Sequence, residues 1–222
     1  MFTKQFEQII ILDIETTGLK YNTDNIIDFG AVVLDSNFNV VEKINMLVKS
    51  KQKLTDKIIE LTHITDEMLE DGVEQNELIH VLSRLITPNS LIVAYNLQFD
   101  ISFIVHLLKH HHPDFNFTSQ VLDMMSVYKD RFDFPHKLAS ALETHNIIND
   151  HAHRAFDDAY STFKLMQAMH QREDISIYIN QIGYHHKFGL NGLRFSHINY
   201  FPHPYIKGSL KRQILNQLNQ LA

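Results

Sequence analysis

The sequence predicts an α/β domain with a mixed central sheet flanked by helices, and two observations indicate this class. The first part of the chain carries three short runs of apolar or alternating residues, and the later part alternates such runs with longer segments of helical periodicity. Strands that come first and then alternate with helices are typical of a sheet covered by helices. The composition agrees, because 44% of the 222 residues are hydrophobic and only seven are Gly, which indicates a packed globular chain.

Four strands are expected from apolar runs bounded by turn residues. Residues 8–15 form an apolar run that contains two acidic side chains near its end, and residues 26–34 follow after a turn-like Tyr-Asn-Thr-Asp-Asn stretch. Residues 40–48 alternate loosely between apolar and polar, and residues 91–95 are short and apolar. These runs supply the strands of the expected sheet.

Helices are expected where apolar residues recur at helical spacing. Four such segments span residues 74–85, 100–108, 137–144 and 154–171, and the last of them is the longest helical pattern in the chain. A further helix is expected near the C-terminus, with Ser209 as its N-cap.

Charge is distributed unevenly along the chain. The formal net charge is −6, but residues 175–222 contain five Lys or Arg and no acidic residue, so this segment carries +5 and residues 1–174 carry −11. Such a shift in composition marks a boundary near residue 174. We therefore expect a body of residues 1–174 followed by a basic, aromatic-rich extension of residues 175–222.

Several classes of protein are disfavoured by what the sequence lacks. The chain has no Cys, which excludes disulfides, thiolate metal sites and a cysteine nucleophile. Its apolar runs are far shorter than the roughly 20 residues that a membrane span needs, and no leader segment is recognisable at the start. The expectation is a soluble, cytoplasmic protein without a membrane partner.

Asp13 and Glu15 are the first candidate functional residues. Side chains on a strand alternate between its faces, so these two carboxylates project on the same side. Adjacent carboxylates repel each other unless a cation lies between them, and Mg²⁺ or Mn²⁺ prefers such oxygen ligands. The alternative is a solvated end of a strand.

Two further acidic residues occupy positions where a carboxylate needs an explanation. Asp100 stands where a helix is expected to begin, and the alternative to a functional role is an N-cap. Asp158 falls on the inward stripe of the long helix, whereas Arg154 and Asp157 fall on a polar stripe that looks solvated. A buried carboxylate requires hydrogen-bond partners or a metal. His153 is expected in the loop before this helix, free to point over the site.

In combination, these segments resemble a known family. The order Asp-x-Glu, then Asn-x-x-Phe-Asp, then His-x-Ala-x-x-Asp is similar to that of the DEDDh, or DnaQ-like, 3′→5′ exonucleases, the group of the proofreading exonuclease subunit of bacterial DNA polymerase III. The resemblance covers roughly residues 7–172 and implies a ribonuclease H-like exonuclease fold. The sister class has Tyr four residues before the last Asp, but here that residue is Arg154, which indicates the histidine class.

The resemblance implies a mechanism and a set of site residues. Asp13, Glu15, Asp100 and Asp158 would hold two divalent cations, Mg²⁺ or Mn²⁺, which offset the charge that develops on the reacting phosphate. His153 would be the general base that takes a proton from the attacking water. The implied reaction is hydrolysis of single-stranded DNA from its 3′ end, with release of nucleoside 5′-monophosphates.

The resemblance also implies contacts to the substrate. The expected substrate-binding residues lie in three segments that flank the acidic residues: Thr17, Gly18, Leu19, Thr62, His63, Asn96 and Phe99. Two departures from the family pattern fall among these segments, because Tyr95 stands where the family usually has His and His63 stands where it usually has Gly.

Other functions remain open on the same residues. An exoribonuclease or an oligonucleotide-clearing enzyme would need only one or two different contacts to recognise a 2′-hydroxyl. A non-catalytic subunit that binds a DNA polymerase is the alternative from another class. The expected partners are accordingly 3′ ends of single-stranded DNA or RNA, with a polymerase subunit as a further possibility. The extension is expected to pack on the body, to contact nucleic acid by its interleaved aromatic and basic residues, or to bind a partner.

Overall fold

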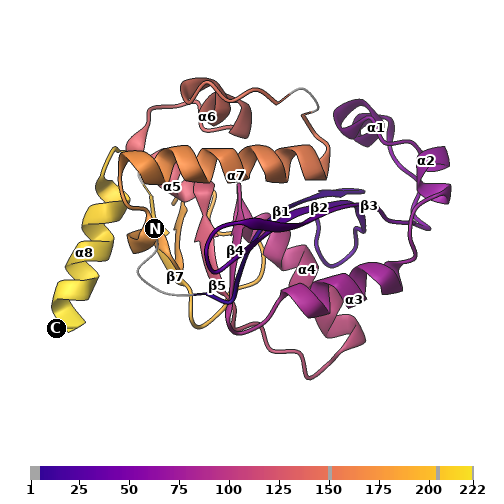
Figure 1. Cartoon of the computed structure of the whole chain (residues 1–222), viewed down its shortest axis with the longest axis horizontal. Helices are drawn as coiled ribbons and strands as arrows, with labels where there is room; N and C mark the ends of the chain where they lie inside the picture. The colour runs from indigo at the N-terminus through magenta and orange to yellow at the C-terminus, as the bar shows by residue number, and fades with distance from the viewer. Residues whose placement is uncertain (1–5, 150–151, 204–205, 222) are drawn as a thin grey trace.

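The computed structural model describes residues 6–149, 152–203 and 206–221. Its centre is a mixed five-stranded sheet in the order β3-β2-β1-β4-β5, in which β1 is antiparallel to β2 and parallel to β4 (Figure 1). The predicted α/β class with a mixed sheet is therefore confirmed. The strands are β1 (Gln8–Thr16), β2 (Ile26–Asp35), β3 (Val40–Leu47), β4 (Ser90–Ala94) and β5 (Gln120–Asp123).

Helices cover both faces of this sheet, and the alternation of side chains in β1 explains why. Ile10 and Leu12 pack on one side with α3 and α4, whereas Ile9 and Ile11 pack on the other side with α5, α6 and α7. The strand is thus apolar on both faces, as a central strand must be. The long helix α7 crosses β1 and β2 (Figure 1). The helices are α3 (Gln75–Leu85), α4 (Leu97–His111), α5 (Met124–Arg131), α6 (Leu138–Thr144) and α7 (Ala155–Arg172).

Two short helices, α1 (Asp56–Thr62) and α2 (Asp66–Glu70), lie beyond β3. Each is capped by a threonine, since the side chains of Thr55 and Thr65 accept hydrogen bonds from the N–H groups of Ile58 and Met68. Their apolar residues join a small cluster of their own beside β2. Periodicity did not predict these helices because seven and five residues are too few to show it.

The start of α4 differs from the sequence expectation. The helix begins at Leu97 and not at Asp100, and Asn96 precedes it in the left-handed conformation. The N–H groups of Asn96 and Leu97 both donate to the carboxylate of Asp123, at 3.2 Å. The interpretation of Asp100 as an N-cap is therefore wrong. The carboxylate of Asp123, at the end of β5, accepts hydrogen bonds from the N–H groups at the start of the helix instead.

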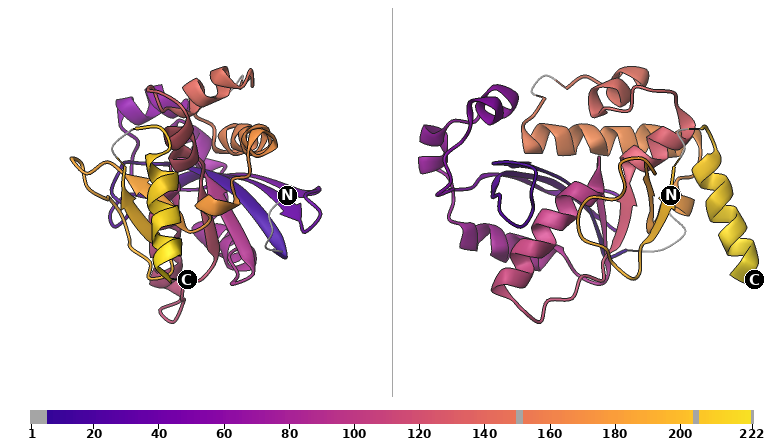
Figure 2. Two further views of the ribbon diagram at one scale, coloured as in Figure 1. Left: turned by 90° about the vertical axis from the view of Figure 1, so that its left-hand side faces the viewer. Right: turned by 180° about the vertical axis from the view of Figure 1, so that it is seen from behind.

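The C-terminal extension forms a short 3₁₀ turn, two parallel strands and a final helix. Its buried residues join the same two apolar clusters as the sheet: Ile175, Tyr178, Ile182, Ile198, Leu210 and Ile214. The elements are η1 (Ser176–Tyr178), β6 (Gln181–Tyr184), β7 (Asn199–Pro202) and α8 (Ser209–Leu221), and α8 stands at the edge of the molecule (Figure 2). Within the described residues, no helix combines the length and apolar character needed to cross a bilayer.

The cap of α8 also corrects an expectation. Ser209 is the first residue of the helix, and its buried hydroxyl has no hydrogen-bond partner among the described residues. The carboxylate of Asp130 instead accepts from the N–H groups of Leu210 and Lys211, at 2.7 and 3.0 Å. The acceptor comes from α5, far away in sequence, so no local pattern could have indicated it.

Candidate active site

The site begins at the carboxyl end of β1. Asp13 and Glu15 lie at alternate positions of β1 from Ile9 and Ile11, whose side chains pack on the α7 side of the sheet. Because alternate side chains of a strand share one face, both carboxylates project towards α7. Pairing with β4 extends only as far as Ile11. The acidic end of β1 is therefore not paired with β4, and other groups can approach it there.

Gly30 determines how closely α7 approaches this end of the strand. It lies opposite Asp13 in the antiparallel pair of β1 and β2. A β-carbon built on Gly30 would lie 2.1 Å from the backbone nitrogen of Phe156 and 2.2 Å from the carbonyl carbon of Ala155. The first turn of α7 thus rests directly on β2, and this contact brings Asp158 to the carboxylates of β1.

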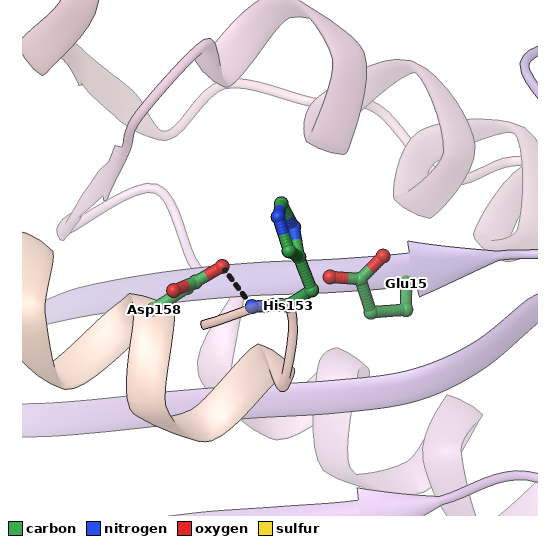
Figure 3. Close-up of side chains that lie close together, drawn as sticks. All are labelled: Glu15, His153 and Asp158. Carbon is green, nitrogen blue, oxygen red and sulfur yellow. Dashed lines mark hydrogen bonds between the residues drawn. The ribbon is translucent and has the colours of Figure 1, made fainter. Parts of the chain in front are cut away.

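Asp158 and His153 are joined by a backbone hydrogen bond (Figure 3). The His153 N–H donates to one carboxylate oxygen of Asp158 at 3.1 Å, and the Asn149 amide donates to the other at 2.6 Å. Asp158 is buried at 8% exposure, which confirms its predicted inward position. His153 lies in the turn before α7 with its side chain exposed. Single ligand atoms of Glu15, His153 and Asp158 lie within 4.8 Å of one another.

Asp100 reaches the same point from the other side of the sheet. It lies in the first turn of α4, is only 2% exposed, and accepts a hydrogen bond from the Ile14 N–H of β1. This N–H is available because β4 ends at Ala94. The charge of Asp100 is, after burial, the largest influence that raises the pKa of Asp13. The structure therefore brings together all four carboxylates singled out in the sequence.

Burial and mutual repulsion make this cluster electrostatically unfavourable by itself. Burial is the main cause that raises the pKa of Asp13 and Asp100 well above the usual range, and nearby carboxylates add to it. Burial, followed by the charges of Asp158 and Asp28, raises the pKa of Glu15 to about 8. Divalent cations with oxygen ligands would relieve this repulsion, so the donor set fits Mg²⁺ or Mn²⁺.

We expect the metal-free protein to become less stable as the pH rises from about 7 to about 8.5. The folded chain retains a proton on Glu15 up to a pKa of about 8, whereas the unfolded chain releases it near 4.5. The unfolded chain then binds fewer protons, so the free energy of unfolding falls as the pH rises through this window. Histidines with a lowered pKa, such as His136, titrate below it.

Thermal unfolding with chelator and with Mn²⁺ at both pH values checks this expectation. Mn²⁺ should raise the Tm more at the higher pH. A larger fraction of the carboxylates is then already deprotonated, so metal binding displaces fewer protons. Glu15→Gln should reduce the pH dependence of the chelator-treated protein, while Asp13 and Asp100 still contribute to it. An equal Tm at both pH values in chelator would contradict the expectation.

A fifth carboxylate, Asp28, lies beneath the site and was not singled out in the sequence. It is fully buried opposite Glu15, and one of its oxygens accepts from the Arg154 Nε at 2.9 Å and from the Ala155 N–H at 3.3 Å. Arg154 therefore does not lie on a solvated stripe, as its helical position suggested. It pairs with a residue 126 positions away, which periodicity cannot detect, and it ties the turn that carries His153 to β2.

The substrate-binding residues predicted from the resemblance fall into two groups. Leu19, Asn96 and Phe99 line one groove beside the acidic cluster, and Leu19 is 84% exposed. The hydroxyl of Thr17 instead donates to the Gln52 side chain and accepts from the Asn25 N–H. These bonds shape the turn that presents Gly18 and Leu19.

Thr62 and His63 lie at the end of α1. Thr62 is fully buried, and its hydroxyl donates to the Ile58 carbonyl and accepts from the Ile64 N–H, so this side chain supports the helix end. His63 is exposed in the left-handed conformation, at φ 57°. Gly adopts this conformation without steric cost, which gives a physical reason for the Gly that the family usually has there.

Tyr95 has a structural role. It is 8% exposed, and its hydroxyl donates to the His136 carbonyl at 2.9 Å, away from the acidic cluster. We expect Tyr95→Phe to lower the free energy of unfolding by about 1–2 kcal/mol, because the buried carbonyl loses its donor. Chemical denaturation measures this change, and the rate of the hydrolysis that the resemblance implies should stay the same. A lower rate in a fully folded variant would instead place Tyr95 in the chemistry.

The order of the five strands and the helices on both faces of the sheet give the chain the ribonuclease H-like exonuclease fold. In structure the chain is similar to E. coli exonuclease I in complex with a dT13 oligonucleotide, with a TM-score of 0.64 and 19% identity over 74% of this chain and 41% of that one. The zinc-bound form of the exonuclease I–single-stranded DNA complex gives a TM-score of 0.67 at 20% identity, over 78% and 42%.

Sequence comparison identifies the family. The profile described as Exonuclease (RNase_T) matches residues 10–166, so the chain belongs to the RNase T/DnaQ-like 3′-5′ exonuclease family. It is 35% identical over 95 residues to the PolC-type DNA polymerase III of Ureaplasma parvum, covering 43% of this chain and 7% of the polymerase. It is 31% identical over 158 residues to the 3′-5′ exonuclease DinG of Staphylococcus epidermidis, covering 70% and 17%. The chain thus spans less than a fifth of either relative.

Proposed function

We propose that this chain is a metal-dependent 3′→5′ exonuclease that releases nucleoside 5′-monophosphates from single-stranded DNA. The observation that carries the proposal is the convergence of Asp13, Glu15, Asp100 and Asp158 at one strand end, with His153 beside them. A scaffold that only binds a polymerase has no use for buried carboxylates that repel one another. The family membership and the relative named 3′-5′ exonuclease support this reading.

The proposal gives each site residue a role. The four carboxylates would hold two Mg²⁺ or Mn²⁺ ions, and the chemistry that these supply is stabilisation of the charge on the reacting phosphate. His153 is exposed above the carboxylates and accepts a proton from the attacking water. The hydrogen bond from its backbone N–H to Asp158 and the Arg154–Asp28 pair hold its turn in place.

The substrate would be a single strand that enters along the groove at Leu19 and Phe99. Stacking on such apolar and aromatic side chains is tolerant of sequence, as an enzyme that removes successive nucleotides requires. The solved exonuclease I structures with dT13 and dA16 oligonucleotides support single-stranded DNA as the first substrate to test. RNA is the second, because recognition of a 2′-hydroxyl requires only one or two contacts.

The test is degradation of matched single-stranded DNA and RNA labelled at the 5′ end or at the 3′ end. Reactions contain Mg²⁺, Mn²⁺ or chelator. We expect the 5′-labelled DNA to shorten stepwise from its 3′ end, the 3′-labelled DNA to release labelled mononucleotide at once, and chelator to stop both reactions. A higher rate on RNA would make the chain an exoribonuclease. Absence of hydrolysis with either polymer and either metal would overturn the proposal.

A further inference from the structure

A groove beside the acidic cluster is built partly by the C-terminal extension. It has a volume of about 330 Å³, which is within the range of ligand pockets. Leu19 and Phe99 line it, and Phe99 precedes Asp100 in the first turn of α4. Tyr184, His185 and Phe188 line it from the extension. Two segments that are far apart in the sequence therefore share one binding surface.

The extension is held firmly against α4 at this groove. The Gln98 side chain donates to the Leu193 carbonyl at 2.5 Å, and the Leu193 N–H donates to the Ser102 hydroxyl at 3.0 Å. A β-carbon on Gly192 would lie 2.2 Å from that hydroxyl oxygen. The backbone of the extension therefore approaches α4 so closely that a larger side chain at residue 192 would collide with Ser102. Gln98 and Ser102 flank Phe99 and Asp100 on the same helix. The hydrogen bonds to Gln98 and Ser102 therefore fix the position of the extension relative to Asp100.

The chemistry of this wall suits unpaired bases and phosphates. Phe188 is 69% exposed, which is unusual for a Phe, and its ring lies 5.0 Å from that of His185. The Lys187 ammonium lies 5.7 Å from the Phe188 ring, and Lys129 also lines the groove. Exposed rings beside cationic side chains are typical of surfaces that bind single strands.

The groove itself is lined by little negative charge. Among its described lining residues, Asp123 is the one acid. The carboxylate of Asp123 is already occupied by the backbone N–H groups at the starts of α4 and α5. The extension contributes positive charge only, since residues 175–222 contain no acidic residue.

We propose that the segment Tyr184–Phe188 is a binding subsite for a single strand, in which Phe188 stacks on an unpaired base upstream of the 3′-terminal nucleotide. This inference rests on the proposed function in that it places the 3′ end of the strand at the acidic cluster. Deletion of the whole extension cannot test it, because residues such as Tyr178 and Leu210 belong to the core. Single substitutions on the exposed wall are required instead.

The experiment measures binding of a fluorescently labelled dT12 oligonucleotide in chelator, so that no hydrolysis is needed for the readout. We expect Phe188→Leu to weaken binding about 10-fold, because the loss of one aromatic stacking contact has roughly this effect. Phe188→Tyr keeps the ring and should bind like the original chain. Phe134→Leu is the matched control, since Phe134 is also exposed, at 83%, but lies outside the groove. A 12-base-pair blunt duplex should bind equally weakly to all variants.

The outcomes separate this inference from the proposed function. Equal affinity of Phe188→Leu and the original chain for dT12, or no detectable binding of dT12 by the original chain, overturns the subsite. An equal loss in Phe134→Leu overturns it as well. Binding that depends on Phe188 in a chain that hydrolyses neither DNA nor RNA would retain the subsite and refute the exonuclease.

Discussion

Replacing Asp158 with Asn is expected to lower the rate of 3′-end hydrolysis at least about 1,000-fold, a loss of roughly 4 kcal/mol of transition-state stabilisation. Asn has nearly the same shape but lacks the negative charge that a divalent cation requires. Asp158 is buried, and one of its carboxylate oxygens lies within 4.8 Å of ligand atoms of Glu15 and His153, so its charge belongs to the expected metal site. The adjacent Asp157 is the matched control, and Asp157→Asn should change the rate less than about threefold.

Initial rates on 5′-labelled single-stranded DNA, measured over a range of Mn²⁺ concentrations, distinguish these variants. Circular dichroism and the Tm in chelator establish that Asp158→Asn is folded. Because burial raises the pKa of Asp158, removal of this charge should not destabilise the metal-free chain severely. Comparable activity of the two variants would mean that the helix presents its acidic residues differently from the structure.

Replacing Gly30 with Ala is expected to destabilise the fold by about 3 kcal/mol and to reduce hydrolysis at least about 100-fold. The added methyl group would overlap the backbone of Ala155 and Phe156, and overpacking of this kind typically costs about 1–3 kcal/mol. Backbone atoms cannot swing aside as a side chain can. Relief therefore requires a shift of the α7 N-terminus, which moves Asp158 and His153 away from Asp13, and a misplacement of about 1 Å can lower a rate about 100-fold.

Chemical denaturation and single-turnover rates measure the two effects of Gly30→Ala. The double variant Gly30→Ala, Phe156→Ala identifies the cause, because truncation of the Phe156 side chain leaves the overlapping backbone in place. It should therefore restore neither stability nor rate. Full activity of Gly30→Ala would show that the position of α7 on β2 does not determine the chemistry.

Much of the fold could be predicted from local patterns. Four of the five strands and the helices α3, α4, α6 and α7 appear near their expected places, because apolar side chains must recur at a period of 2 or 3.6 to reach a core. The final helix α8 also appears where it was expected, whereas α1, α2, α5, β5, β6 and β7 were not predicted. Among the predicted elements, the errors lie at the ends of helices. Asp123 caps α4 and Asp130 caps α8, and both acceptors come from other elements.

The candidate site shows the same division. The alternation of β1 places Asp13 and Glu15 on one face, and the helical stripe of α7 turns Asp158 inward, so the type and orientation of these residues followed from the sequence. Asp28 and Arg154 could not be recognised as a pair, because their contact joins positions 126 residues apart. That this pair attaches the turn of His153 to β2 could be recognised only from the structure.

Local sequence patterns were therefore sufficient to predict the class of fold, the order of the acidic residues and the resemblance to a family of exonucleases. Periodicity and motif spacing are local properties of the sequence, so they can be recognised without a structure. Three features required the three-dimensional structure: the unpaired end of β1, the close approach of α7 at Gly30, and the groove wall that the extension forms with Phe188. These features depend on contacts between distant segments, whose geometry is settled when the core packs.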